Sequence, residues 1–286
     1  MTLVAEKALT PQRLYTGTQI RSVRYGKGKP ILFIHGLGGN WQSWGSVLYD
    51  VAREREVIAV NLPGSGDAPP LPGEMSVRTL ADALTAFLQD NNLSGVDAVG
   101  SSLGARLVLE LARRGGVVGS VVALNPGGFW RGWERYAFFA SLWLSVRLVR
   151  GLQPAMPRLV ESAAARTLLF AQLSACPWDL PPRLMRNEMR SYAVSASFDE
   201  LLRRLAFGEE QQGAPRGSVT APLVIGWGRR DRVCFPWQAK RAIEKFPDAQ
   251  LHWFENCGHF PQWDKPAETA RLILATVGTP ARTAGQ

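Results

Sequence analysis

Short apolar runs alternate with helical patterns in the N-terminal part of the chain. The runs at 30–34, 57–60 and 117–124 are almost continuously apolar, which is typical of strands buried on both faces of a sheet. Between them, apolar residues recur at helical spacing over 77–88 and 103–113. Because strands and helices alternate, we predict an α/β fold with a mostly parallel, doubly wound sheet and right-handed crossovers.

The alternation stops over residues 129–218. Helical patterns in this stretch are interrupted by several prolines, and we predict that it forms a helical cap inserted into the sheet domain. Its first helix, predicted from Trp133 to Arg150, carries apolar residues on nearly every side. Such a helix has to be buried against the core, a hydrophobic ligand, a second subunit or a membrane surface, so a homodimer is one expectation.

Sheet patterning resumes after the cap. The stretches at 222–228 and 249–254 predict two further strands, with a helix between them over 236–246. A helix over 266–276 closes the predicted fold, and we expect a disordered tail. The predicted division is a first core part at 20–128, the cap at 129–218, a second core part at 219–278 and the tail at 279–286.

Composition and charge narrow the possible functions. The 286 residues contain no run of about 18 to 20 apolar residues that would span a membrane, and the first ten residues, which include Glu6 and Lys7, lack a signal-peptide core. We therefore expect a cytoplasmic protein without an integral membrane segment. The net charge is +9, but the basic residues are scattered, so no nucleic-acid partner is expected.

Two counts refine this picture. The three cysteines, Cys176, Cys234 and Cys257, are odd in number and lack metal-ligand spacing, so we predict neither a disulfide framework nor a metal site. Between residues 129 and 216 there are twelve arginines, no lysine and eight acidic residues. One of these arginines has the charge needed to meet a substrate carboxylate, although a solvated helix face is the commoner explanation.

A glycine-flanked serine lies where a predicted strand meets a predicted helix. The chain reads Gly100-Ser101-Ser102-Leu103-Gly104, which is the G-x-S-x-G pattern. The two glycines allow a sharp turn that lifts the Ser102 hydroxyl clear of the sheet at a helix N-terminus. Ser102 rather than Ser101 holds the central position, so Ser102 is the predicted nucleophile.

A serine hydroxyl is a poor nucleophile until an imidazole removes its proton. The chain has three histidines, His35, His252 and His259. His259 and Asp231 each follow a late predicted strand, and loops that follow parallel strands meet at one edge of a sheet. We therefore assign His259 as the base and Asp231 as the carboxylate that orients it. We expect His35 to hold its own loop and His252 to face solvent from a strand.

The loop that follows the first buried strand completes the predicted site. Residues 35–39 read His-Gly-Leu-Gly-Gly, a sequence that permits backbone N–H groups to point into the site. The N–H of Leu37 and that of Leu103, the residue after the nucleophile, are the predicted oxyanion hole.

The order Ser102, Asp231, His259, with a glycine-rich donor loop ahead of the nucleophile, resembles the serine-nucleophile branch of the α/β-hydrolase family. The resemblance covers residues 20–278 apart from the cap. It implies hydrolysis through an acyl-enzyme, without a metal or cofactor.

The resemblance leaves the substrate open. The donor loop, 37–41, is similar to that of carboxylesterases and cofactor-free haloperoxidases. The stretches 125–129 and 251–263 are similar to hydrolases that cleave carbon-carbon bonds in ring-fission products, whose cap supplies an arginine for a carboxylate, here Arg186 or Arg190. We favour an esterase of small hydrophobic acyl substrates, with a carbon-carbon hydrolase of vinylogous diketone acids as the alternative.

Two further expectations concern the cap. We expect it to cover Ser102, with Phe139 and Trp143 of the aromatic helix lining the substrate pocket. A scaffold that binds a ligand without catalysis is a second alternative function, which the complete set of Ser102, His259 and Asp231 disfavours.

Overall fold

The structure, a computed structural model, describes residues 12–14 and 19–278, so the predicted tail at 279–286 lies outside it. Within these residues eight strands form one sheet in the order β1-β2-β4-β3-β5-β6-β7-β8. β2 pairs antiparallel with β1 and β4, and the other neighbouring pairs are parallel. The strands are β1 (Gln12–Leu14), β2 (Arg21–Tyr25), β3 (Pro30–Ile34), β4 (Glu56–Asn61), β5 (Val96–Ser101), β6 (Val118–Leu124), β7 (Leu223–Gly228) and β8 (Gln250–Phe254).

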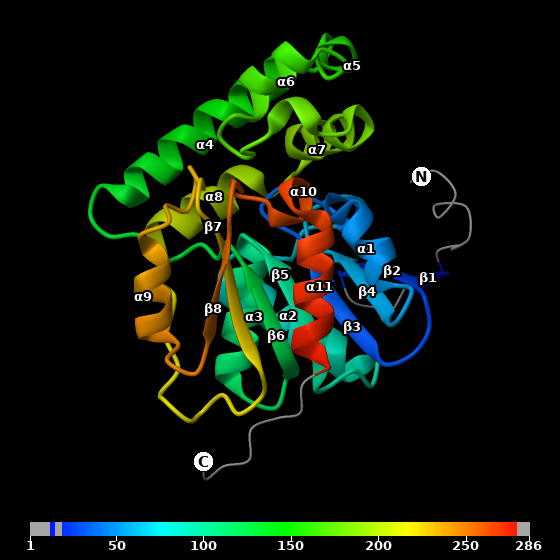
Figure 1. Ribbon diagram of the computed structural model, residues 1–286, viewed down its shortest axis with the longest axis vertical. Coiled ribbons are helices and arrows are strands. Elements are labelled where there is room, and N and C mark those ends of the chain that lie inside the picture. The colour runs from blue at the N-terminus through cyan, green and yellow to red at the C-terminus, as the bar shows by residue number, and fades with distance from the viewer. Residues whose placement is uncertain (1–11, 15–18, 279–286) are drawn as a thin grey trace.

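Helices cover both faces of this sheet (Figure 1), which confirms the predicted fold class. α1 and α11 pack on one face, whereas α2, α3 and α9 pack on the other. The helices of the core are η1 (Trp41–Trp44), α1 (Ser46–Val51), α2 (Val77–Asp90), α3 (Leu103–Arg114), α9 (Gln238–Lys245), α10 (Pro261–Asp264) and α11 (Pro266–Val277). Those between β6 and β7 are α4 (Glu134–Gly151), α5 (Met156–Leu159), α6 (Ala163–Phe170), η2 (Pro177–Asp179), α7 (Pro182–Val194) and α8 (Phe198–Phe207).

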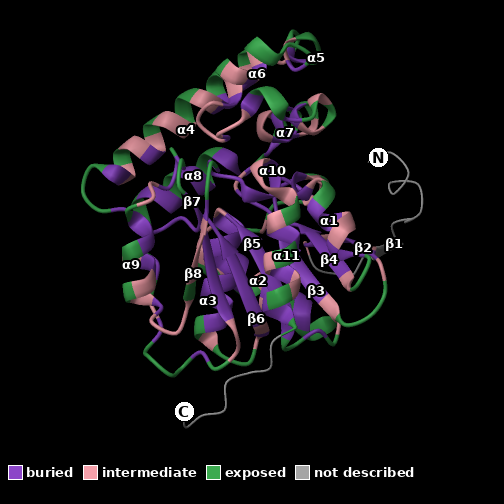
Figure 2. Cartoon of the chain, in the orientation of Figure 1, coloured by how far each residue is buried: buried purple, intermediate pink, exposed green. Residues whose placement is uncertain are grey.

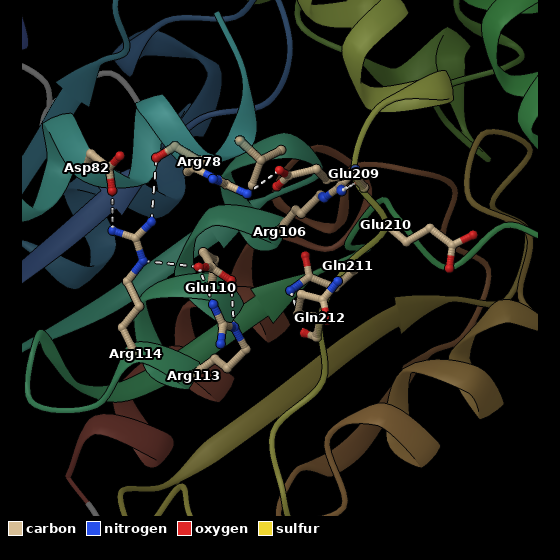
Figure 3. Close-up of a pocket in the computed structure, with 11 residues that line it drawn as sticks. Arg78, Asp82, Arg106, Glu110, Arg113, Arg114, Glu209, Glu210, Gln211 and Gln212 are labelled. Carbon is tan, nitrogen blue, oxygen red and sulfur yellow. Dashed lines mark hydrogen bonds and ion pairs between the residues drawn. The ribbon is translucent and has the colours of Figure 1, made fainter.

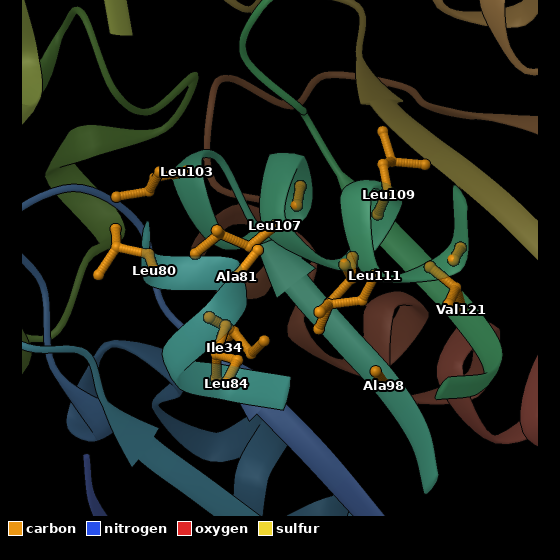
Figure 4. Close-up of a cluster of buried hydrophobic side chains, with 14 of the residues drawn as sticks. Ile34, Leu80, Ala81, Leu84, Ala98, Leu103, Leu107, Leu109, Leu111 and Val121 are labelled. Atoms are coloured by element: carbon orange, nitrogen blue, oxygen red, sulfur yellow. The ribbon is translucent and has the colours of Figure 1, made fainter. Parts of the chain in front are cut away.

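Side chains of the central strands alternate between two apolar clusters. Ile34 in β3 and Ala98 in β5 point into the cluster that α2 and α3 complete (Figure 4). Phe33 and Val99, their neighbours in sequence, point into the cluster that α1 and α11 complete. Because both faces are covered, these strands are apolar at successive positions, which explains the continuous runs in the sequence.

The helices between β6 and β7 lie over the carboxyl ends of the parallel strands (Figure 1). The hydroxyl of Ser191 in α7 donates a hydrogen bond to the carbonyl oxygen of Gly38 at 2.7 Å. Ser195, just after α7, donates to the carbonyl oxygen of Gly64 at 3.2 Å. A third apolar cluster joins Met185 of α7 to Trp263 of α10. These contacts fix the inserted helices over the edge of the sheet where β3 and β4 end.

The chain returns from α8 to the core beside a charged cleft of about 520 Å³ along α2 and α3 (Figure 3). Arg114 of α3 pairs with Asp82 of α2 at 2.7 Å and with Glu110 at 3.0 Å. The buried Arg106 of α3 donates to the carbonyl oxygens of Leu205 and Glu209. The ion pair between Arg114 and Asp82 therefore joins α3 to α2. The hydrogen bonds of Arg106 hold the end of α8, and the chain just after it, against α3.

α4, the predicted helix from Trp133 to Arg150, is buried on one side. Phe138, Val146 and Val149 are buried, whereas the opposite side of the helix is exposed (Figure 2). The expectation that this helix is covered all round is therefore met on one side alone. In the described part of the chain no helix is long and apolar enough to cross a membrane.

Candidate active site

A sharp turn at Ser102 joins β5 to α3. Ser102 has φ 56° and ψ −110°, and a positive φ is uncommon outside glycine and costs on the order of 1–3 kcal/mol. A Cβ atom on Gly100 would lie 2.1 Å from the carbonyl oxygen of Gly104, and one on Gly104 would lie 2.0 Å from that of Ile34. Both positions therefore require glycine, and the turn presents Ser102 beyond the end of β5.

A chain of hydrogen bonds links Ser102, His259 and Asp231. Ser102 Oγ lies 2.9 Å from His259 Nε2, and His259 Nδ1 lies 2.8 Å from Asp231 Oδ2. His259 and Asp231 are buried, whereas Ser102 is half-buried. The backbone N–H of His259 donates to the carbonyl oxygen of Leu173, just after α6, at 2.8 Å. The structure thus brings together the three predicted residues and places part of the cap against the histidine.

Four donors surround the Asp231 carboxylate. Its Oδ1 accepts from the backbone N–H groups of Val233 at 2.8 Å and Cys234 at 3.0 Å. Its Oδ2, besides meeting the imidazole, accepts from Asn125 Nδ2 at 2.5 Å. Asn125 follows β6, and its own Oδ1 accepts from the N–H of Gly228 at 3.3 Å. Asn125 therefore fixes the carboxylate from the strand next to β7, a role that sequence reasoning missed.

The two adjacent serines have different partners. Ser101 is fully buried, and its Oγ accepts from Gln262 Nε2 at 3.0 Å. Ser102, one residue later, meets the imidazole of His259. This geometry supports the choice of Ser102 over Ser101 as the candidate nucleophile. Gln262, which holds the Ser101 side chain, was not singled out in the sequence.

The glycine-rich loop after β3 lies directly beside Ser102. A Cβ atom on Gly36 would be 3.2 Å from Ser102 Cβ. Within residues 12–14 and 19–278, no group accepts a hydrogen bond from the N–H of Leu37 or from that of Leu103, the first residue of α3. Two unpaired backbone donors beside a nucleophile are the arrangement that an oxyanion hole needs.

His35 and His252 have structural partners. The N–H of Leu62 donates to His35 Nε2 at 3.1 Å, so Nδ1 carries the proton and donates to the carbonyl oxygen of Gly36 at 2.7 Å. Burial lowers the pKa of His35 to about 4, which keeps the ring neutral near pH 7. His35 thus holds its loop, as expected. His252 on β8 is partly buried beside Glu268, with 3.0 Å between Nε2 and Oε1.

Aromatic side chains pack around the donor loop. A Cβ atom on Gly38 would lie 2.5 Å from the ring of Phe198 and 3.0 Å from that of Tyr192, so both rings touch the loop. Phe260 contacts His259 in an edge-on arrangement, with 4.8 Å between ring centroids. These three rings were absent from the predicted substrate residues, although the position of Phe260 directly after His259 was a signal for it.

The two predicted aromatic residues of α4 have different surroundings. Phe139 packs against Phe207 of α8, with ring centroids 5.1 Å apart. Trp143 is 42% exposed, and the guanidinium of Arg147 lies 5.2 Å from the centre of its ring. Trp143 is therefore a surface residue, which corrects its predicted place in a substrate pocket, because it lies on the side of α4 away from Phe138.

The predicted cap arginines are also on the surface. Arg186 and Arg190 are exposed, and Arg186 pairs with Glu161 at 2.6 Å. The side of α7 that packs inward carries Met185 and Met189 instead. The structure does not bring either arginine to Ser102, because each lies on the opposite side of the helix.

Among the described residues one group of side chains has the donors to hold a metal ion, namely Asp231, Cys234 and His259. Burial raises the pKa of the Cys234 thiol far above its usual value, so the thiolate that a metal prefers is disfavoured. Asp231 and His259 already bond to each other. The donor set therefore fits an acid–base pair better than a metal site.

The inward side of α7 carries a buried carboxyl group. Glu188 has no exposed surface, and its carboxyl faces the hydroxyls of Ser43 and Tyr192 without forming a full hydrogen bond to either. Desolvation raises its pKa to about 7. Ser43 also accepts from the N–H of Asn40, next to the donor loop. The protonation of Glu188 in α7 is therefore coupled, through Ser43, to the packing of this loop.

Replacing Glu188 by glutamine should remove a pH dependence of stability. The folded protein keeps the Glu188 proton up to about pH 7, whereas an unfolded chain loses it near its ordinary pKa of 4.5. The free energy of unfolding should therefore fall by up to about 3 kcal/mol as the pH rises from 4.5 to 7. Glu188→Gln should flatten the melting temperature over this window, and the exposed Glu161→Gln should not. The prediction would be contradicted if the melting temperatures of Glu188→Gln and the wild type changed with pH in the same way.

Known proteins are similar to this chain along most of its length. The family model described as "alpha/beta hydrolase fold" matches residues 29–266. An uncharacterized protein of Mycobacterium tuberculosis is 29% identical over an alignment of 263 positions, which covers 87% of this chain and 75% of that protein. A 2-hydroxy-6-oxononadienedioate/2-hydroxy-6-oxononatrienedioate hydrolase of Cupriavidus pinatubonensis is 25% identical over 257 residues, with 87% of this chain and 86% of that protein covered.

Solved structures include similar folds. The crystal structure of a membrane phospholipase A, described as a bacterial virulence factor, superposes with a TM-score of 0.72 at 22% sequence identity. The match covers 94% of this chain and 86% of the phospholipase. At this identity the likeness concerns the fold.

Proposed function

Because the chain belongs to the α/β-hydrolase family, we propose that it is a serine hydrolase that cleaves hydrophobic carboxylic esters through an acyl-enzyme. The observation that carries this proposal is the hydrogen-bonded chain from Ser102 through His259 to Asp231, at 2.9 and 2.8 Å. The strained turn at Ser102 supports it as well, because such strain persists where the surrounding structure imposes it, often at an active site.

The proposed reaction has two halves. His259 Nε2 takes the proton of Ser102 as Oγ attacks the ester carbonyl, while Asp231 holds the imidazole in the required tautomer. The N–H groups of Leu37 and Leu103 receive the developing oxyanion, each contributing about 3 to 4 kcal/mol. His259 then returns the proton to the leaving alcohol and activates water, which releases the acid from Ser102.

The surroundings of the nucleophile favour an apolar acyl group. The rings of Phe198, Tyr192 and Phe260 flank the donor loop and the base, and these surfaces gain free energy by covering alkyl chains. Arg186 and Arg190, the candidates for binding a carboxylate, are exposed on the other side of α7. This placement weakens the carbon-carbon hydrolase alternative, which the relative from Cupriavidus pinatubonensis would otherwise favour.

A series of esters with increasing acyl length tests the proposed substrate. Each added methylene should raise kcat/KM by up to about fourfold, equivalent to 0.8 kcal/mol, until the pocket is full. Phe198→Ala should flatten this profile, whereas the control Trp143→Ala should keep it. Because ratios between substrates do not depend on the folded fraction, the comparison holds if Phe198→Ala is less stable.

Three results would redirect the proposal. A flat profile in the native protein would contradict an acyl pocket beside Phe198. Preference for a vinylogous diketone acid over all the esters would assign the protein to the carbon-carbon hydrolases. Absence of labelling by a fluorophosphonate would favour the scaffold that binds a ligand without catalysis.

A further inference from the structure

The outward side of α4 is an exposed apolar stripe. From residue 133 to residue 148, five of the exposed side chains are large and apolar or aromatic, with between 42% and 65% of their surface exposed. The other exposed residues there are Ala140 and Arg147. The five are Trp133, Tyr136, Trp143, Leu144 and Leu148. We call these seven residues the α4 outer face.

This stripe is unusual for a helix on the surface of a domain. The inward side of α4 already packs Phe138, Val146 and Val149 against the protein, and the outward side of such a helix normally carries polar and charged residues. α4 lies along the outer edge of the molecule (Figures 1 and 2). The described part of the chain therefore leaves the α4 outer face without an apolar covering.

Ring contacts extend the stripe beyond α4. Phe207 of α8 is 42% exposed, and its ring centroid is 5.5 Å from that of Tyr136. At the same, N-terminal end of the stripe, Trp133 contacts Phe235, with 5.8 Å between ring centroids, and Phe235 stacks on the exposed Trp237 at 4.5 Å. Patches of this kind mark interaction sites more often than isolated exposed residues do.

The charges at the stripe favour an anionic partner. Arg147 is exposed, and its guanidinium lies 5.2 Å from the centre of the Trp143 ring. Glu134 is buried, and it is neutralised by Arg241 at 2.6 Å. The α4 outer face itself carries no carboxylate. A second copy of this face would bring another cation, in a chain of net charge +9, whereas a surface of anionic headgroups would complement it.

We propose that the α4 outer face docks flat on an anionic lipid surface. It extends over sixteen residues, 133–148, which span about 24 Å, and tryptophan, tyrosine and leucine beside arginine are the composition of helices that lie in the membrane interface. The tryptophan rings and leucines enter the boundary between headgroups and acyl chains, and Arg147 meets lipid phosphate. This attachment goes beyond the proposed hydrolysis and does not depend on it.

Sedimentation with vesicles tests the proposal. The full chain carrying Ser102→Ala is used, so that no lipid is hydrolysed. It should bind phosphatidylcholine vesicles containing phosphatidylglycerol more tightly than vesicles of phosphatidylcholine alone, and salt should weaken this binding. Adding Leu144→Ser and Leu148→Ser together should lower the partition coefficient by about tenfold or more. Adding Arg147→Ala should lower it by about fivefold.

A matched control and a second measurement complete the test. Val194 of α7 is 64% exposed and lies outside the α4 outer face, so Val194→Ser should leave the partition coefficient unchanged. Equal vesicle binding by the double leucine variant and its parent would overturn the proposal. The proposal would also be overturned if the parent does not bind vesicles and gel filtration shows that it is a dimer, which the two leucine substitutions convert to a monomer. Ester hydrolysis by the wild-type chain, measured separately, tells whether the proposed chemistry fails too.

Discussion

Ser102→Ala is expected to abolish nearly all ester hydrolysis, with a fall in kcat of about 10⁴- to 10⁶-fold. The substitution removes the hydroxyl that lies 2.9 Å from His259 Nε2. It leaves the glycine-dependent turn in place, since the close approaches are made by the backbones of Gly100 and Gly104. The melting temperature should therefore stay within a few degrees of the wild-type value. Steady-state kinetics with one ester and a melting curve measure both quantities.

Ser101→Ala is the matched control. Ser101 Oγ bonds to Gln262 in the buried interior, so its removal should cost stability of about 1 to 3 kcal/mol and leave the chemical step largely intact. Mass spectrometry after fluorophosphonate treatment should find the adduct on Ser102 in the wild type. An adduct on any other residue would refute the assignment of the nucleophile.

Asp231→Asn should lower kcat by on the order of 10⁴. The carboxylate accepts from the imidazole at 2.8 Å and from Asn125 at 2.5 Å through the same oxygen. An amide at this position retains the shape but offers an N–H group to the imidazole, which favours the wrong tautomer of His259. Stopped-time assays with a large excess of enzyme over substrate are suited to such a residual rate.

Asn125→Ala separates orientation from charge at this position. It leaves the Asp231 carboxylate with its two backbone donors, Val233 and Cys234, and removes one charge-assisted hydrogen bond. Loss of such a bond corresponds to a fall in kcat of about ten- to a hundredfold. If Asp231→Asn costs no more than Asn125→Ala, then the carboxylate is not acting on the base as proposed.

Much of the core was predictable because its patterns are local. Strands buried on both faces show continuous apolar runs, and the helices beside them show one apolar stripe each. The three candidate catalytic residues were predictable for a related reason. Ser102, Asp231 and His259 each follow a strand, and parallel strands place their following loops at one edge.

The partners of these residues were not predictable from local patterns. Asn125 meets Asp231 across 106 positions of sequence, and Gln262 meets Ser101 across 161. Neither amide has a motif that announces its partner. Such contacts follow from the order of strands and the placement of α10, which a single sequence specifies only through the complete fold.

The buried side of α7 could be predicted in part from the sequence. Met185, Met189 and Tyr192 recur at helical spacing and mark the inward side, which puts Arg186 and Arg190 on the outward side. The chemistry expected of an arginine in the cap directed attention to the charges rather than to this stripe. In α4, by contrast, apolar residues occur on both sides of the helix, so the sequence did not indicate which side is buried.

The segment between β6 and β7 leaves and re-enters the core at neighbouring strands. β6 and β7 are paired neighbours, with Leu124 opposite Gly226, so the two ends of the inserted segment are held at adjacent strands whatever lies between them. Asn125, the first residue after β6, is also a donor to Asp231. The core thus sets where the inserted segment leaves and re-enters the sheet, and the residue at which the segment leaves also holds the Asp231 carboxylate.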